Sequence, residues 1–134
     1  MELEFLLHGT QEARAYAIPL HEPASERPSI LDWRPMIGEI LAGVESGTNT
    51  GLISARFHNG LAEGIVAVAK KFGEKRVVLS GGCFQNRYLC ERSVFRLREE
   101  GFCPYWHQRV PPNDGGIALG RIVGALRSKA SAID

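Results

Sequence analysis

Apolar residues recur every three to four positions over much of this chain. That spacing places apolar side chains on one face of a helix, which then packs against a core. The pattern predicts four amphipathic helices, at residues 33–44, 52–72, 86–100 and 115–128, and residues 3–7 predict the tail of another. The face of the first of the four that we expect to pack into the core carries Trp33, Ile37, Ile40, Leu41 and Val44.

Two glycines lie four residues apart inside the predicted helix at residues 52–72, at Gly60 and Gly64. Each costs a helix up to about 1 kcal/mol relative to alanine. We therefore expect them to mark a place where another element approaches the helix closely.

Short apolar runs predict strands at residues 14–20, 77–79 and 102–107. Pro19 limits the first to an edge strand or a strand end. The order strand, two helices, strand, helix, strand, helix favours an α/β fold in which neighbouring strands are parallel and flanked by helices. The length of 134 residues fits a single domain over residues 1–134.

Each of the last two predicted strands runs into a glycine-rich turn before a helix. The first turn begins Ser80-Gly81-Gly82, and the second has the sequence PPNDGG at residues 111–116. Ligands bind at the carboxyl ends of parallel strands, so we expect both turns on one edge of the sheet. Glycines let backbone N–H groups approach phosphate or ribose oxygens, and an aspartate at a helix start can hold a metal or a hydroxyl. The pair of turns favours ATP or an acyl-adenylate.

Each turn also has an explanation without a ligand. A Gly-Gly pair at a strand end is useful for the turn itself, and Asp114 is an obvious helix cap. The P-loop and the G-x-G-x-x-G pattern are both absent from the sequence.

The charge balance excludes two classes of partner. A net charge of +1, from 16 basic and 15 acidic residues, gives no electrostatic case for nucleic acid or an anionic membrane. No apolar run approaches the roughly 20 residues of a membrane span. The N-terminus carries acids where a signal peptide carries basic residues, so we expect a cytoplasmic protein.

The three cysteines have no C-x-x-C spacing, which favours reduced structural thiols over disulfides or zinc. Cys83 is a reserve site candidate because it lies in the first glycine turn. His58, in the helix at residues 52–72, is a second reserve candidate, although a lone helical histidine is more often a satisfied polar residue than a ligand.

Four longer segments of the sequence carry a resemblance to a known family. LSGGCFQNRYLCER and VPPNDGGIALG, preceded by LDWRPMI and ISARFHNGLAEGI, closely resemble the C-terminal part of the TsaD-like transferase domain of the hydrogenase maturation carbamoyltransferases, HypF. The resemblance implies half of an actin-like ATPase/TsaD-like fold. Enzymes of that family make a carbamoyl-adenylate from carbamoyl phosphate and ATP. They pass the carbamoyl group to the C-terminal cysteine of a partner, HypE, and the thiocarbamate becomes the cyanide ligand of [NiFe]-hydrogenase iron.

The resemblance also assigns roles to single residues. It places nucleotide binding on Gly81, Gly82, Asn86, Asn113 and Gly115. It places the family's metal-ligating aspartate on Asp114, where it would bind a divalent metal of unknown identity. The family's H-x-x-x-H metal pair has no match here.

Members of that family are several times longer, and this chain resembles only the last half of their final domain. The resemblance therefore implies a C-terminal lobe that is inactive alone, has no assigned catalytic residue and works with the remaining HypF domains or an N-terminal subunit. Two alternatives stay open. One is a non-catalytic nucleotide-binding or assembly module that self-associates through an uncovered sheet face. The other is a fragment of a small-molecule O-carbamoyltransferase or a threonylcarbamoyl transferase.

Overall fold

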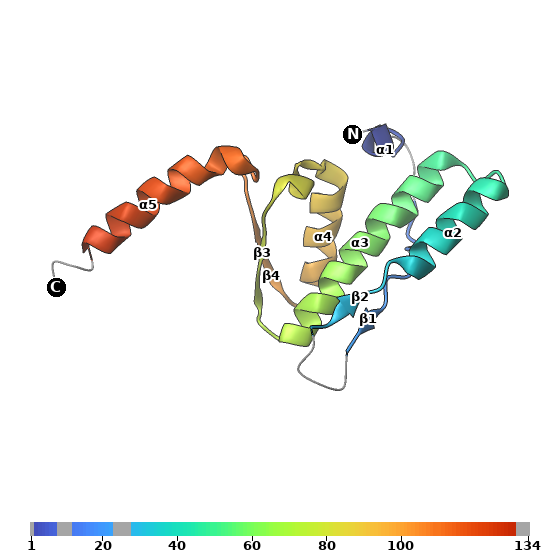
Figure 1. The fold of residues 1–134 in the computed structure, drawn as a ribbon, viewed down its shortest axis with the longest axis horizontal. Helices are drawn as coiled ribbons and strands as arrows, with labels where there is room; N and C mark the ends of the chain where they lie inside the picture. Colours follow the sequence, from blue (N-terminus) through green and yellow to red (C-terminus); the bar gives the residue numbers. More distant parts are fainter. Residues whose placement is uncertain (1, 8–11, 23–27, 131–134) are drawn as a thin grey trace.

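The computed structural model describes residues 2–7, 12–22 and 28–130 (Figure 1). The elements follow in the order α1 (Glu2–Phe5), β1 (Leu20–His21), β2 (Ile30–Leu31), α2 (Arg34–Glu45), α3 (Thr50–Phe72), β3 (Arg76–Leu79), η1 (Gly82–Gln85), α4 (Arg87–Glu99), β4 (Cys103–Trp106), η2 (Asp114–Gly116) and α5 (Ile117–Ala130). The four amphipathic helices predicted from the pattern are all present, with ends shifted by at most two residues.

The central sheet consists of β3 and β4, which pair in parallel from Arg76 opposite Cys103 to Leu79 opposite Trp106. Helix α4 connects the two strands, which confirms the predicted parallel arrangement. Helices α3 and α4 lie side by side against this sheet, and α2 lies on the outer side of α3 (Figure 1). The core between these layers is formed by Val66, Ala69, Leu79, Val94 and Leu97.

The predicted strand at residues 14–20 is wrong for most of its length. Only Leu20 and His21 form β1, which pairs antiparallel with β2 rather than joining the parallel sheet. The preceding residues run along α3, where the backbone N–H of Tyr16 donates to the carbonyl of Arg56 at 3.1 Å. Since α3 satisfies this backbone, the segment has no need of a strand partner. Its alternating pattern arises because Tyr16 and Ile18 face the helices.

A buried asparagine fixes this segment. Asn59 is fully buried on α3, and its side-chain amide donates to the carbonyls of Glu12 and Arg14, each at 2.9 Å. Its carbonyl oxygen accepts from the Tyr88 hydroxyl of α4 at 3.0 Å. Hydrogen bonds from Arg14, and a further one from Arg56, lower the pKa of Glu12 to about 2. One side chain of α3 therefore links the N-terminal segment to α4.

The prediction that the apolar face of α2 packs into the core is wrong for most of that face. Met36 is its buried residue, whereas Trp33, Leu41 and Val44 are 60%, 58% and 61% exposed. In the described part of the chain, α2 contacts mainly α3, so most of its apolar face has nothing to pack against. The periodic pattern identified the helix but could not tell how many neighbours cover it.

Candidate functional site

The first glycine turn begins where β3 ends at the buried Leu79. Gly81 has φ 103° and ψ 160°, a conformation that only glycine adopts readily. The chain then forms η1 and enters α4, whose first turn is capped by Asn86 through a hydrogen bond from the Leu89 N–H to Oδ1 at 2.9 Å. A Cβ at Gly81 or Gly82 would have no atom within 4 Å, so the turn presents open backbone.

The second turn follows β4 and is shaped by Asn113. Its Oδ1 accepts from the N–H of Gly115 at 3.0 Å, which caps η2. A Cβ at Gly115 would lie 3.1 Å from that oxygen, and one at Gly116 would lie 3.1 Å from the carbonyl oxygen of Pro111. Both glycines of this turn are therefore explained by close packing within the turn itself.

Asp114 is the first residue of η2 and is exposed. The interpretation of Asp114 as a helix cap is wrong, because the neighbouring Asn113 provides the cap. Among the residues described, the Asp114 carboxylate makes no hydrogen bond or ion pair. A free carboxylate is a hard oxygen ligand and fits a divalent cation. Within the described ranges no three His, Cys, Asp or Glu side chains gather as a metal site.

Both turns follow the carboxyl ends of the parallel strands. The Ser80 hydroxyl, directly after β3, lies 3.0 Å from Nε2 of His107, directly after β4. In Figure 1 both turns lie at the upper end of the strand pair, close to the start of α5. The expectation that both turns lie on one edge of the sheet is confirmed.

Ser80 and His107 are residues of this edge that are not among the site residues predicted from the sequence. Both are exposed polar residues. A signal is present in the sequence, since Ser80 directly follows the apolar run at residues 77–79 and His107 is the last residue of the predicted strand at residues 102–107. What the sequence lacked was the register that places Leu79 opposite Trp106 and so brings the next two residues together.

His58 is buried, with 3% of its surface exposed, and lies beneath the first turn rather than in it. Its Nδ1 is 2.7 Å from the carbonyl oxygen of Ser54, and its Nε2 is 2.8 Å from the side-chain nitrogen of Asn86. The structure thus joins two residues singled out from the sequence, 28 positions apart.

The cysteines are all free thiols. Cys83 is exposed in η1 and helps to line an apolar cavity of about 720 Å³ between α3 and β3. Burial, and to a lesser degree the charge of Glu91, raises the pKa of the Cys90 thiol, which suits a structural role. Whether Cys83 acts in the site stays a prediction.

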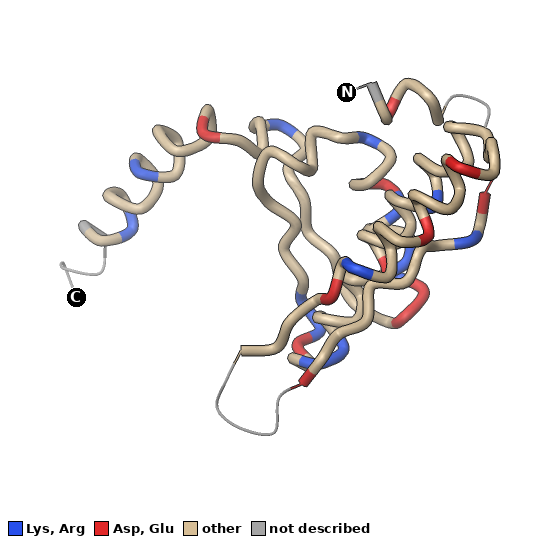
Figure 2. Tube along the Cα trace, turned by 45° about the vertical axis from the view of Figure 1, so that its right-hand side comes forward, with Lys and Arg blue, Asp and Glu red and all other residues tan. Residues whose placement is uncertain are grey.

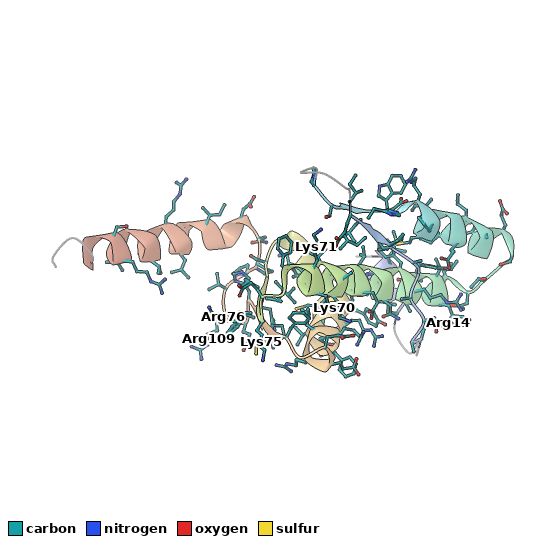
Figure 3. All side chains as sticks on the ribbon, turned by 90° about the horizontal axis from the view of Figure 1, so that it is seen from below. Arg14, Lys70, Lys71, Lys75, Arg76 and Arg109 are labelled. Carbon is teal, nitrogen blue, oxygen red and sulfur yellow. The ribbon has the colours of Figure 1, made fainter. Side chains whose placement is uncertain are left out.

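Charges of both signs are interspersed over the body of the molecule (Figure 2). Four of the basic residues labelled in Figure 3 lie near the end of α3 and the start of β3, at the amino ends of the parallel strands, namely Lys70, Lys71, Lys75 and Arg76. Two of them are paired, Lys70 with Glu100 at 2.7 Å and Lys71 with Glu22 at 3.2 Å. The glycine turns lie at the opposite edge of the sheet, where backbone N–H groups of the open first turn can donate to a phosphate. No helix in the described ranges has the length and apolar character to cross a membrane.

The chain is similar in sequence to proteins of known family. A family model described as "Carbamoyltransferase, Kae1-like Domain, second subdomain" matches residues 1–121. The carbamoyltransferase HypF of Synechocystis sp. is 38% identical over 111 residues, which cover 83% of this chain. The chain belongs to the HypF family. The HypF of Rhizobium leguminosarum is 40% identical over 96 residues, or 68% of the chain.

Solved HypF structures match the fold. Full-length HypF in its phosphate- and nucleotide-bound form aligns with a TM-score of 0.74 and 34% identity over 89% of this chain. HypF of T. kodakarensis shares the fold with a TM-score of 0.70 over 96% of the chain. These matches confirm the resemblance and the α/β, Kae1-like fold class. The chain spans only 14% of the Synechocystis HypF and 16% of the nucleotide-bound HypF structure.

Proposed function

We propose that this chain is the C-terminal lobe, over residues 1–134, of a HypF-type carbamoyltransferase and forms one wall of its nucleotide site. The observation that carries the proposal is the 3.0 Å contact between Ser80 and His107, which joins the carboxyl ends of β3 and β4, the strand ends that lead into the two glycine turns. Membership of the HypF family supports it, as does a relative solved with phosphate and nucleotide bound.

The first turn would hold ATP or the carbamoyl-adenylate. Gly81 and Gly82 leave room for phosphate or ribose oxygens to reach backbone N–H groups. The side-chain amide of Asn86 donates one N–H to Nε2 of His58, and its Oδ1 accepts one hydrogen bond from the Leu89 N–H. Its second N–H and the second lone pair of Oδ1 are therefore available to ribose or base. Asn113 and Gly115 would act by shaping the second turn.

Asp114 would hold a divalent metal from this side of the site. Such a metal neutralises phosphate charge or polarises the carbamoyl group when it is bound. The remaining ligands would come from outside this chain, as the family resemblance implies. No catalytic residue is assigned to this chain, and we expect it to have no activity alone.

The complete reaction would need partners. The carbamoyl group, from carbamoyl phosphate by way of the carbamoyl-adenylate, would pass to the C-terminal cysteine of HypE in the cytoplasm, in the maturation of [NiFe]-hydrogenase. The remaining HypF domains or an N-terminal subunit would supply adenylate formation and the opposing wall.

Calorimetric titration of ATP, with and without Mg²⁺, tests the site. We expect metal-dependent binding by the wild type that is lost in Asp114→Ala, because the only carboxylate proposed as a metal ligand is then gone. Glu39→Gln is a matched control, since Glu39 is an exposed acid on α2. Equal metal-dependent binding by Asp114→Ala, or no ATP binding by the wild type, would contradict the proposed site. Turnover of ATP and carbamoyl phosphate by the chain alone, at the rate of a full-length HypF, would contradict the proposal that this chain forms only one wall of the site.

A second candidate function is an assembly module that self-associates. Helix α5 projects away from the body of the molecule (Figure 1), with Ile117, Ile122 and Leu126 52%, 59% and 64% exposed. Phe72 and Val78, beside the apolar cavity, are 73% and 70% exposed. Exposed apolar side chains on α5 and beside the cavity favour association.

Sedimentation velocity tests this second candidate. We expect the isolated chain to associate as its concentration rises, and the double variant Ile122→Glu with Leu126→Glu to shift the distribution toward the monomer. A monomeric wild type at high concentration would contradict self-association, and only the first proposal, the lobe of a larger enzyme, would then remain.

A further inference from the structure

The hydrogen bonds of His58 determine which ring nitrogen carries the proton. The Ser54 hydroxyl, 3.4 Å from Nδ1, donates its own proton to the carbonyl of Leu3 and so does not compete as a donor. A backbone carbonyl can only accept, so the 2.7 Å contact with the Ser54 carbonyl places the proton on Nδ1. In a neutral imidazole the other nitrogen, Nε2, is then an acceptor. It lies 2.8 Å from the side-chain nitrogen of Asn86, which is a donor.

An independent contact fixes the orientation of Asn86. The backbone N–H of Leu89 can only donate, and it lies 2.9 Å from Oδ1 of Asn86. The NH₂ end of the amide must therefore face His58. The tautomer derived from Ser54 and the amide orientation derived from Leu89 agree, so the chain of bonds has one consistent assignment.

Packing holds the imidazole in this orientation. The rings of Phe57 and Tyr88 stand edge-on to it, with centroids 5.3 Å and 5.7 Å away. On the other side, the Ser54 hydroxyl donates to the carbonyl of Leu3 in α1. The chain of contacts runs from α1 through α3 to the residue that ends the first glycine turn.

We propose that His58 is a positioning residue for the nucleotide turn. Its neutral Nδ1–H tautomer holds the Asn86 amide in one orientation, so that the second N–H and the second lone pair of that amide are presented to a ligand in a fixed geometry. The inference rests on the proposed function of the turn and adds a residue that touches no ligand. It makes the affinity of the turn depend on the packing of α3.

Nitrogen-15 NMR of the nucleotide-free chain tests the positioning directly. We expect long-range proton–nitrogen correlations to show His58 protonated on Nδ1 in the wild type. In His58→Leu, the side-chain amide of Asn86 and the backbone amides of residues 81–85 should shift. A proton on Nε2, or an unshifted turn in His58→Leu, would overturn the proposal whether or not the chain binds nucleotide.

Calorimetric titration of ATP supplies the functional arm. We expect His58→Leu to weaken the Kd for ATP about tenfold, the order of one lost hydrogen bond. His58→Gln retains a donor and an acceptor and should restore part of the affinity. Leu97→Val shortens a fully buried side chain near the other end of α4, so it should lower stability without changing the Kd.

The outcomes separate the two proposals. Equal ATP affinity in a folded His58→Leu, or a loss of affinity in Leu97→Val that matches its loss of stability, would overturn the positioning role. If the wild type binds no ATP, the proposed nucleotide site fails, and the NMR measurement alone decides whether His58 positions the turn.

Discussion

Gly60→Ala is expected to destabilise the chain by about 3 kcal/mol, the upper end of the usual cost of overpacking. A Cβ at this position would lie 2.6 Å from the backbone oxygen of Tyr16. Tyr16 cannot easily move away, because its N–H donates to the carbonyl of Arg56 on the same helix. Urea denaturation followed by circular dichroism would measure the loss as a lower midpoint at an unchanged slope.

Gly64→Ala is the matched control, one turn further along α3. A Cβ there would lie 3.8 Å from the side chain of Leu31, an ordinary contact. The substitution also removes a helical glycine, which is worth up to about 1 kcal/mol. We expect Gly64→Ala to be neutral or stabilising. Equal losses in the two variants would show that the approach of Tyr16 does not explain the glycine at position 60.

Gly81→Ala is expected to cost about 1–3 kcal/mol and to abolish ATP binding. The φ of 103° at this position strains any residue with a Cβ, so the turn must change shape or the strain must remain. Thermal unfolding would report the loss of stability, and calorimetry would report the loss of ATP affinity. A fully stable Gly81→Ala would mean that the turn adopts an ordinary φ in solution.

Gly82→Ala separates the shape of the turn from its proposed contact with nucleotide. Gly82 has no positive φ, and a Cβ there would meet nothing within 4 Å. We therefore expect its stability to change by no more than about 0.5 kcal/mol. If the turn backbone approaches a phosphate, the added methyl group should still weaken ATP binding. Unchanged affinity would contradict the assignment of Gly82 to nucleotide contact.

The local pattern was sufficient for most of the elements. The long apolar stripe predicted a helix over residues 52–72, and α3 begins only two residues earlier, where Asn49 caps it. The order of elements predicted the parallel pairing of β3 and β4. Both follow from interactions within one segment or between segments joined by a single helix.

The hydrophobic pattern gave wrong predictions where the contacts of a segment come from an unexpected neighbour or are missing. Residues 14–18 alternate like a strand, but Asn59 and the carbonyl of Arg56 bind their backbone and leave no ladder. The apolar face of α2 predicted burial, yet Trp33 and Leu41 are exposed. In both cases the missing information is the identity of the neighbour.

The sequence by itself determined the two glycine turns, their positions after strands and the family to which those strings belong. Only the tertiary structure decided that Ser80 meets His107, that His58 holds Asn86 and that Gly60 faces Tyr16. Turns depend on the backbone preferences of a few adjacent residues, which the sequence displays directly. The other three contacts join residues 27 to 44 positions apart, so they depend on strand register and helix packing, which arise only when the whole chain folds.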